Sequence, residues 1–341
     1  TWLLGTSAAA SAEGDRLVVG GYWPAFGLSL DLHRPRVLVL DSDLGVIRSV
    51  DAAAGLDLLL STVEMSRDGT MAAYLGPGRQ VDIMDVESGR TFTIPDSENW
   101  AASLAFSPDN RLIAGGGVSA RGEMSVAVWK ADTGEHLYRL DGHGPPVPTN
   151  DGGITATMGT VVVFNPVSED LVSGGFDGTV RRWDLQTARS TILHTFPFEV
   201  ASVAVSNDGS LIAASDHTGE IVLLDAGTGE VLLRPERVSG RTFLTFSLDD
   251  SLLAGAGPDP VTNVWDVASG RIIRRLHGAI YQAKSVAFLE GGSVLMVASG
   301  ESVQRRYLLD PHRLLELARA EVGRDMTEDE CLRYLDRACE S

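Results

Sequence analysis

Lysine is nearly absent from this chain of 341 residues, which has only Lys130 and Lys284 among its 28 basic residues. Acidic residues number 46, so the formal net charge is −18. Nucleic-acid binding draws on clustered lysine and arginine, so phosphate backbones should repel a chain this acidic. We therefore expect neither nucleic acid nor an anionic membrane surface as a partner. The preference for arginine, alanine and glycine is typical of a GC-rich bacterial genome.

Cysteine is equally rare, and Cys331 and Cys339 both lie in a segment with helical character near the C-terminus. Eight residues apart on one helix, the two side chains would lie beyond disulfide distance, so we expect two free thiols. Free thiols are typical of a reducing compartment, and the sequence therefore predicts a cytoplasmic protein.

Long apolar runs are missing too, and none approaches the ~20 residues that a membrane helix needs. Residues 2–12 resemble the end of a secretory signal peptide in their small side chains, but they have no basic start and too short an apolar part. A secreted or periplasmic protein is therefore a further hypothesis, which rests on this resemblance alone. Because the chain does not begin with Met, we expect it to be part of a longer protein.

Catalytic and metal-binding signatures are missing as well. The sequence has no glycine-rich phosphate loop with lysine, no His-Glu-x-x-His and no Gly-x-Ser-x-Gly. Its seven histidines lack the close spacing of a zinc site. Asp68, Asp109 and Asp208 are not spaced like a calcium loop and favour β-turns capped by side chains. We expect no catalytic residue, no metal and no cofactor.

A repeat dominates what is present. Each unit has an apolar strand, a tight turn that begins with Ser or a substitute, a second apolar strand, and a third strand that usually ends in an apolar residue and Asp. The turns begin at Ser11, Ser66, Ser107, Asn165, Ser206, Ser247 and Leu289. The most regular spacings are 41 and 42 residues. Four strands within a period of about 40–45 residues are typical of a propeller blade.

The third strands end with the same period, at Leu40-Asp41, Met84-Asp85, Trp129-Lys130, Trp183-Asp184, Leu224-Asp225, Trp265-Asp266 and Leu309-Asp310. In these pairs the chain resembles the WD-repeat family, and the best copy runs from Ser173 to Asp184. The resemblance covers about residues 1–310 and implies an all-β fold, a seven-bladed β-propeller. A ring buries both apolar faces of each sheet and leaves only short edges.

Closure of the ring depends on its two ends. Asp310 and Pro311 suit the N-cap and the first position of a helix, so the seventh unit lacks a fourth strand of its own. Residues 1–5 precede the first unit and have no other place in the pattern. We predict that they complete the seventh blade.

The tail, residues 311–341, is predicted to be a short helical segment packed on the propeller. Leu314, Leu315 and Leu317 give residues 311–322 an apolar stripe, and a capping box at Thr327 and Glu330 begins a second helix. Amphipathic stripes of this kind are usually buried against a core, so we expect contact with the side or underside of the disc.

The tail also resembles the end of bacterial multidomain signalling proteins, in which a propeller follows a STAND-type nucleotide-binding ATPase. The matching positions are residues 314–320, Met326, Thr327, Glu330, Cys331, Tyr334 and Leu335. This resemblance implies that the chain is the sensor or regulatory end of a larger protein.

His143 takes the Gly-His position of the repeat family. The resemblance implies a hydrogen-bonded chain of His143, Ser173, Asp177 and Trp183 within one blade. Ser, His and Asp together could also form a catalytic triad. We favour the structural role, because a triad needs an exposed nucleophile beside an oxyanion hole.

Loop lengths indicate where a partner would bind. The extra residues, at 21–35, 117–123 and 142–159, all fall on the face of the disc that carries the loops between second and third strands and between blades. Function often resides on variable loops over a rigid scaffold, and aromatic side chains dominate protein interfaces. Candidate contact residues on this face are Tyr22, Trp23, Phe26, Trp100, Pro146, Phe198 and Tyr281. Packing between blades is the alternative role for each aromatic side chain.

The leading hypothesis is a non-catalytic scaffold that binds a protein or peptide on this face. The alternative is a propeller enzyme or small-ligand binder that acts at the central channel, which would need polar groups with perturbed pKa values there.

Overall fold

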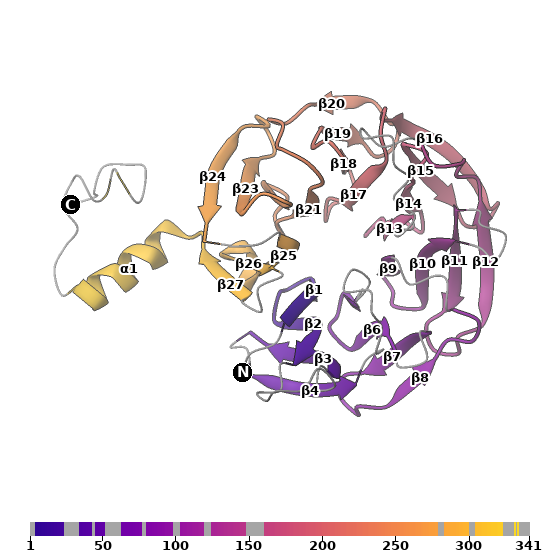
Figure 1. Ribbon diagram of the computed structural model, residues 1–341, viewed down its shortest axis with the longest axis horizontal. Helices are drawn as coiled ribbons and strands as arrows, with labels where there is room; N and C mark the ends of the chain where they lie inside the picture. The colour runs from indigo at the N-terminus through magenta and orange to yellow at the C-terminus, as the bar shows by residue number, and fades with distance from the viewer. Residues whose placement is uncertain are drawn as a thin grey trace.

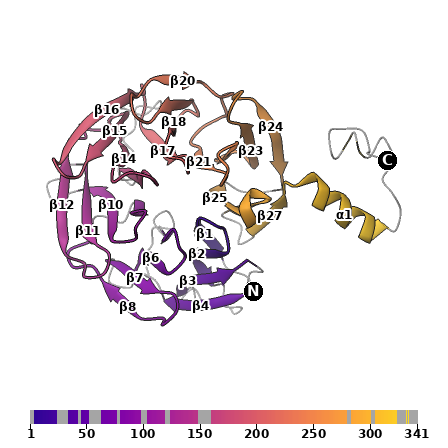
Figure 2. The ribbon, with the colours of Figure 1, turned by 180° about the vertical axis from the view of Figure 1, so that it is seen from behind.

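The computed structural model describes residues 4–23, 34–42, 45–51, 63–76, 80–97, 103–118, 124–147, 160–278, 283–299, 304–322, Cys331 and Arg333. In this part of the chain, seven antiparallel sheets surround a central axis, so the protein is a seven-bladed β-propeller, as the sequence predicts (Figure 1). The view from behind shows the same closed ring (Figure 2).

The strands of blades one to four follow one another in chain order. Blade one has β1 (Leu4–Ala10), β2 (Arg16–Trp23), β3 (Arg34–Asp41) and β4 (Val46–Asp51). Blade two has β5 (Val63–Met65), β6 (Met71–Leu75), β7 (Val81–Asp85) and β8 (Thr91–Thr93). Blade three has β9 (Ser103–Phe106), β10 (Leu112–Val118), β11 (Met124–Lys130) and β12 (His136–Asp141). Blade four has β13 (Val161–Phe164), β14 (Leu171–Gly174), β15 (Thr179–Asp184) and β16 (Arg189–Thr195).

The remaining blades continue the pattern around the ring. Blade five has β17 (Val200–Val205), β18 (Leu211–Asp216), β19 (Ile221–Asp225) and β20 (Val231–Leu233). Blade six has β21 (Phe243–Phe246), β22 (Leu252–Ala256), β23 (Val261–Asp266) and β24 (Ile272–His277). Blade seven has β25 (Ala283–Leu289), β26 (Val294–Ser299) and β27 (Gln304–Leu308), with a 3-10 turn at Glu290–Gly292. The first strand of each blade lies nearest the axis (Figure 1).

Apolar side chains on both faces of the sheets hold the blades together. In β11 every residue from Met124 to Trp129 is buried, which leaves no solvent-facing side to the strand. Trp129 packs in a cluster with Ile83 of blade two and Ile113 of its own blade, so the cluster spans the boundary between two blades. Burying one large apolar side chain stabilises the fold by roughly 1.5–3 kcal/mol. The repeated sheets therefore form a closed ring, because each sheet needs a neighbour on both sides to bury its apolar faces.

The serine turns at Ser11, Ser66, Ser107, Ser206 and Ser247 give five of the blades the same hairpin between their first two strands. Ser66 Oγ lies 2.8 Å from Asp68 Oδ1 and accepts a hydrogen bond from Met71 N at 2.8 Å. The fourth residue of this turn has a left-handed backbone, with φ of 70° at Gly69 and 60° at Asn110 of the next blade. Glycine and asparagine tolerate this conformation, so the turn type is set by the sequence.

The first and seventh blades meet directly, and the predicted closure is wrong. Leu4 and Gly5 pair with Tyr22 and Gly21 of β2, so they belong to blade one, while residues 1–3 lie outside the described part. The reason is the length of the first blade. Strand β2 continues to Trp23, and the innermost strand β1 extends with it rather than crossing to the seventh blade.

Closure is achieved instead by contacts between two complete strands. Ser285 Oγ on β25 donates a hydrogen bond to Ala8 O at 2.6 Å and accepts one from Ala8 N at 3.2 Å. Around this pair, Leu17 and Val19 of blade one pack with Leu289 and Met296 of blade seven. The seam that joins the two ends of the propeller therefore has the same kind of apolar core as the other seams.

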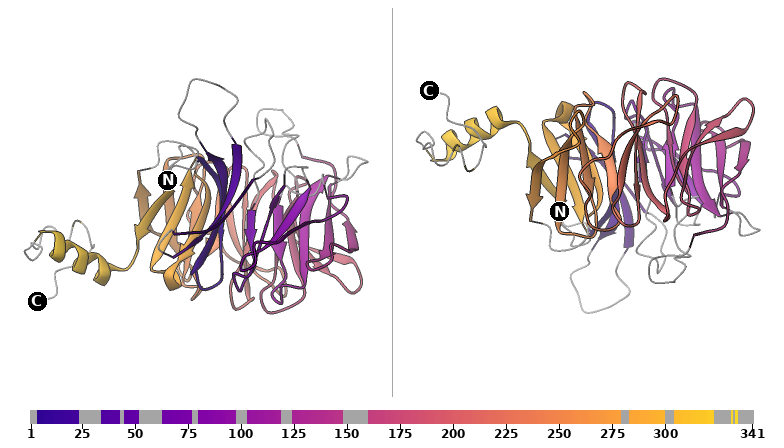
Figure 3. Two further views of the ribbon diagram at one scale, coloured as in Figure 1. Left: turned by 90° about the horizontal axis from the view of Figure 1, so that it is seen from below. Right: turned by 90° about the horizontal axis from the view of Figure 1, so that it is seen from above.

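The helix of the tail, α1 (Pro311–Val322), forms where the sequence predicts it but does not lie along the propeller. The side view shows it extending outward from blade seven (Figure 3). Arg313 forms an ion pair with Glu290 near the start of the helix, whereas Leu314 and Leu317 are 37% and 52% exposed. The expected packing on the disc is therefore wrong for α1. The second predicted helix lies outside the described residues except at Cys331 and Arg333.

The cysteines also differ from expectation. Cys331 is buried and disulfide-bonded, and Cys339 is the only other cysteine in the sequence. The prediction of two free thiols is wrong because it assumed one helix through both residues. Eight residues of helix span about 12 Å, whereas the Cα atoms of a disulfide lie about 4.4–6.8 Å apart.

Replacing Ser285 by Ala should loosen the seam between the first and last blades. The substitution removes both bonds to Ala8 and should cost about 1–3 kcal/mol of unfolding free energy. Hydrogen exchange should then rise in β1 and β25. The matched variant Ser202→Ala removes a bond across the boundary between blades five and six and should raise exchange in β17 and β21. Equal protection of β1 and β25 in both variants would contradict this closure.

Candidate functional site

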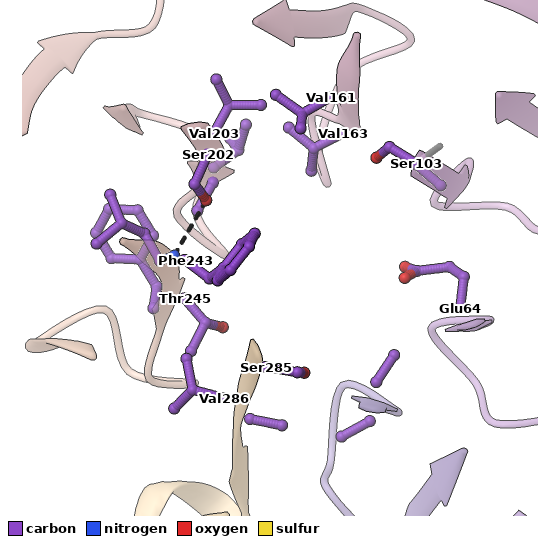
Figure 4. Close-up of a pocket in the computed structure, with 18 of the residues that line it drawn as sticks. Glu64, Ser103, Val161, Val163, Ser202, Val203, Phe243, Thr245, Ser285 and Val286 are labelled. Carbon is purple, nitrogen blue, oxygen red and sulfur yellow. Dashed lines mark hydrogen bonds between the residues drawn. The ribbon is translucent and has the colours of Figure 1, made fainter. Parts of the chain in front are cut away.

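The centre of the ring is open. A cavity of about 840 Å³ runs between the innermost strands of the seven blades. Valine and phenylalanine side chains line much of it, including Val161, Val163 and Phe243, and hydroxyls of Ser103, Ser202 and Ser285 are interspersed among them (Figure 4). The channel thus offers a mixed surface of apolar groups and hydroxyl oxygens.

The channel serines face the cavity and also form hydrogen bonds that link neighbouring blades. Ser103 Oγ accepts a hydrogen bond from Val162 N of the next blade at 3.1 Å, and Ser202 Oγ accepts one from Leu244 N at 3.0 Å. Ser285 makes the corresponding contact to blade one. Each of these serines joins one inner strand to the next, which fixes the hydroxyls at constant positions around the axis.

Glu64 is the exceptional residue of the channel. It lies in the middle of β5, and its carboxylate points into the cavity (Figure 4). Burial raises the pKa of Glu64 from 4.5 to about 8, and its carboxylate makes no hydrogen bond or ion pair within the described part of the chain. A carboxyl held neutral near physiological pH by its surroundings is a common feature of functional sites.

A charged cluster lies beside the channel on the face that carries the loops between blades. Glu199, just before β17, is buried, with His217 Nδ1 3.0 Å from its Oε1 and Arg241 paired with the same oxygen. The backbone reinforces this arrangement, since His217 N donates to Glu199 O at 2.9 Å. His217 and Arg241 both line the cavity, so this cluster forms part of its rim.

The four residues of the implied hydrogen-bonded chain lie together in blade four and the segment that precedes it. Trp183 Nε1 donates to Ser173 Oγ at 2.7 Å, Ser173 Oγ lies 2.7 Å from His143 Nε2, and His143 Nδ1 lies 3.0 Å from Asp177 Oδ1. Asp177 also accepts bonds from Gly144 N and Thr179. Burial acts to raise the pKa of Asp177, but the bond and charge of His143 and these further donors hold it well below its usual range.

This order of contacts matches that of a catalytic triad, so burial must decide between the two roles. The indole can only donate, so the Ser173 hydroxyl accepts from it and faces His143 Nε2 with its remaining hydrogen-bonding capacity. Ser173 has no exposed surface, and its oxygen is already occupied by the Trp183 N–H. No substrate could reach the Ser173 hydroxyl in this fold. The series of hydrogen bonds instead holds the loop at His143 against blade four.

The predicted contact residues are only partly described. Tyr22 and Trp23 extend β2, so residues 21–23 and 34–35 of the first expected insertion are strand rather than loop. Phe26, Trp100 and Tyr281 lie outside the described residues. Pro146 is exposed, and Phe198 is half-buried.

Pro146 and Phe198 flank the same turn of blade four. On one side Val147 N donates to Phe176 O at 2.8 Å, and on the other Phe196 N donates to Gly178 O at 2.8 Å. Phe198 is followed directly by Glu199 of the charged cluster. Pro146 and Phe198 are thus held on either side of this largely buried turn, and Phe198 leads into the cluster that contains His217 and Arg241. We call Pro146, Phe198, His217 and Arg241 the loop-face patch.

Metal sites are not formed by the described residues, none of whose His, Cys, Asp and Glu side chains gather in a group that could hold an ion. The acidic turns illustrate why. The Asp208 carboxylate accepts bonds from Ser206 Oγ at 2.6 Å and Ser210 N at 2.9 Å, and these bonds lower its pKa. The carboxylate oxygens of Asp208 thus complete a β-turn.

Among the described residues, no helix is long and apolar enough to cross a membrane.

Glu64 and the cluster of Glu199, His217 and Arg241 were not predicted from the sequence. A signal for Glu64 was available, because an acidic residue interrupts an otherwise apolar innermost strand at Val63-Glu64-Met65. The sequence has no comparable signal for the cluster, since its members come from three separate loops and only the closed ring brings them together.

Comparison with known proteins supports the repeat assignment. Residues 134–184 match the family described as "WD domain, G-beta repeat", a stretch that includes His143, Ser173, Asp177 and Trp183. The chain is 26% identical over 238 residues to Periodic tryptophan protein 2 of Arabidopsis thaliana, which covers 63% of this chain and 24% of that protein.

Two further relatives are named as subunits. The guanine nucleotide-binding protein subunit beta of Oryza sativa subsp. indica is 25% identical over 191 residues, 52% of this chain and 47% of its own. The eukaryotic translation initiation factor 3 subunit I of Neurospora crassa is 33% identical over 141 residues, 40% of this chain and 36% of its own. The chain thus spans between about a quarter and a half of the curated relatives it matches.

Replacing Ser173 by Ala should destabilise blade four. The change leaves the buried Trp183 N–H and His143 Nε2 without their partner, at a cost of about 1–3 kcal/mol. Urea unfolding followed by tryptophan fluorescence measures this loss. The control Ser168→Ala changes a half-buried turn serine and should cost much less. A fully stable Ser173→Ala variant would contradict the structural role.

Replacing Glu64 by Gln should change the pH dependence of stability. The folded carboxyl titrates at about pH 8 and the unfolded one near 4.5, so the wild-type protein loses stability as pH rises between these values. The slope is at most about 1.4 kcal/mol per pH unit. Urea unfolding should be measured from pH 5 to 9. The unfolding free energy of the glutamine variant should rise relative to that of the wild type up to pH 8 and then stay constant relative to it.

The exposed Glu169 provides the control, because Glu169→Gln makes the same chemical change outside the channel and should leave the profile unaltered. Parallel profiles of wild type and Glu64→Gln would mean that Glu64 is ionised in the folded protein.

Proposed function

We propose that this chain is a non-catalytic scaffold that binds a protein or peptide partner at the loop-face patch. The carrying observation is that the segments with an exposed proline and a half-buried phenylalanine are both bonded to one turn of blade four, and that the phenylalanine is followed directly by Glu199 of the charged cluster. Interfaces are enriched in aromatic and arginine side chains that are held in place before binding. Relatives named as subunits of larger assemblies support the same role.

Rigidity is the physical reason for choosing this patch. Gly144 and Val147 are both bonded to blade four, so Pro146 is held between two anchored residues. Phe198 lies between the bonded Phe196 and Val200, which donates to Gly175 O at 3.1 Å. A partner that docks here would therefore order few additional residues, which lowers the entropy cost of binding.

The wider setting is also part of the proposal. The resemblance of the tail to bacterial signalling proteins supports a place as the sensor or regulatory end of a larger ATPase, although the relatives matched above are eukaryotic. The location in the cytoplasm stays a prediction, and the disulfide at Cys331 removes the argument from free thiols. Sequencing the full gene would test the setting: an upstream ATPase or effector domain supports it, and a complete secreted reading frame contradicts it.

Charged substitutions should separate the two faces of the disc. Pro146→Asp and Phe198→Asp place a carboxylate in the patch and should reduce recovery of partners that co-purify with the tagged full-length protein at least tenfold. The control Val167→Asp alters a side chain that is 66% exposed in the turn between the first two strands of blade four, on the opposite face. It should leave recovery intact. Loss of partners only with Val167→Asp would contradict the proposal, and circular dichroism checks that each variant folds.

A further inference from the structure

The central channel contains a charge-bearing group that the scaffold role does not use. Within the parts of the innermost strands that the structure describes, Glu64 is the only acidic residue. At the same distance before the first turn, the other six blades carry Ala9, Ala105, Val163, Ala204, Thr245 and Ala287, so the fold does not require a carboxyl at this position. An unpaired carboxyl also destabilises the folded state, because burial penalises its charged form.

The surroundings of Glu64 suit a cation that brings its own hydrogen-bond donors. Ser103, on the blade next to Glu64, accepts one backbone hydrogen bond, so its hydroxyl oxygen has a second lone pair for a donor in the cavity. Ser202 has the same free lone pair on the opposite wall of the channel (Figure 4). Phe243 projects into the channel on the side facing Glu64 (Figure 4). An aromatic ring contributes further to the binding of a desolvated cation.

We propose that the channel binds a ligand bearing a primary ammonium group, with Glu64 as its counter-ion, channel hydroxyls as further acceptors, and the valine-lined wall as the surface for its alkyl chain. An ammonium ion has three donors and no acceptor, which matches one carboxylate and several hydroxyl oxygens. A divalent metal ion is a poorer match, because calcium takes 6–8 oxygen ligands and Glu64 belongs to no group of three or more His, Cys, Asp or Glu side chains among the described residues.

Other ionisable groups lie at the ends of the cavity and set its electrostatic background. Glu13 and Arg67 line the end at the serine turns, and His217 and Arg241, paired with Glu199, line the opposite rim. Lys284 is on β25, and its side chain is outside the described part. The two arginines favour ammonium binding deep in the channel over binding at its mouths.

Proton linkage gives the site a signature. A ligand with a charged amine binds the ionised form of Glu64, which is the minor form at pH 7 when the pKa is about 8. Affinity should therefore rise about tenfold between pH 7 and pH 9, with most of the gain below pH 8. The ligand remains charged over this range, since alkylamines such as lysine titrate near pH 10.4.

The test uses n-butylammonium chloride as the probe and n-butanol as its uncharged counterpart. Isothermal titration calorimetry of the folded protein at pH 6, 7, 8 and 9 should detect saturable butylammonium binding that strengthens with pH, and no comparable butanol binding. Glu64→Gln should weaken butylammonium at least tenfold and abolish the pH dependence, whereas Glu169→Gln should behave like wild type.

Three results would overturn the proposal: no saturable binding at pH 9, equal binding of butanol, or unchanged binding in Glu64→Gln. A second measurement follows the carboxyl carbon of Glu64 by NMR, and its titration should shift to lower pH when butylammonium is added. An unshifted titration would also overturn it.

A free amine and a lysine side chain of a partner share this chemistry, so the peptide acetyl-Gly-Gly-Lys-Gly-Gly-amide provides a second arm. Tighter binding of the peptide than of butylammonium supports a lysine inserted by a partner, and the reverse supports a small amine. The proposal stands apart from partner binding at the loop-face patch, because butylammonium binding is measured on the purified protein without any partner. Failure of one test therefore does not count against the other.

Discussion

Packing of one blade against the next is the interaction on which this structure depends. Each sheet is too thin to have a core of its own, and its two apolar faces are buried only when a neighbour lies on each side. The buried tryptophans Trp129, Trp183 and Trp265 sit at these boundaries. Because the ring has no free end, the first and last blades must meet as tightly as any other pair. The bonds between Ser285 and Ala8 and the apolar cluster around Leu17 and Leu289 meet that requirement.

The same constraint creates both candidate sites. Bringing seven innermost strands around one axis leaves a channel that side chains do not fill, and the carboxyl of Glu64 there has no ion-pair partner among the described residues. Bringing the loops of successive blades onto one face joins residues that are far apart in sequence, such as Glu199 and Arg241. No local sequence motif predicts either site, because the geometry of each depends on the closed ring.

The sequence predicted those features that depend on interactions within one repeat. Ser, Asp and Gly at fixed spacing determine the turns, and the pairs such as Trp183-Asp184 mark the third strands, so the number of blades followed from the period. The contacts of His143, Ser173, Asp177 and Trp183 were implied by the resemblance to the WD-repeat family, which could be applied because the four residues fall within a single repeat and its preceding loop.

Prediction failed where a non-local choice decides the outcome. Residues 4–5 could pair with either the first or the seventh blade, and only the length of β2, which continues to Trp23, settles the choice. The leucines of α1 predict a buried stripe, but nothing in their spacing says what would cover it. Glu64 was missed because the chemistry of a channel depends on all seven strands at once.

Hydrogen–deuterium exchange of the full-length protein, with and without its co-purified partner, tests the central claim most directly. The account predicts that the partner protects backbone amides at residues 142–147, 175–178, 196–199 and 217–219, on the face where the loops between blades meet. Protection confined to the serine turns, such as residues 66–71 and 206–211, or to the outer strands, would contradict it.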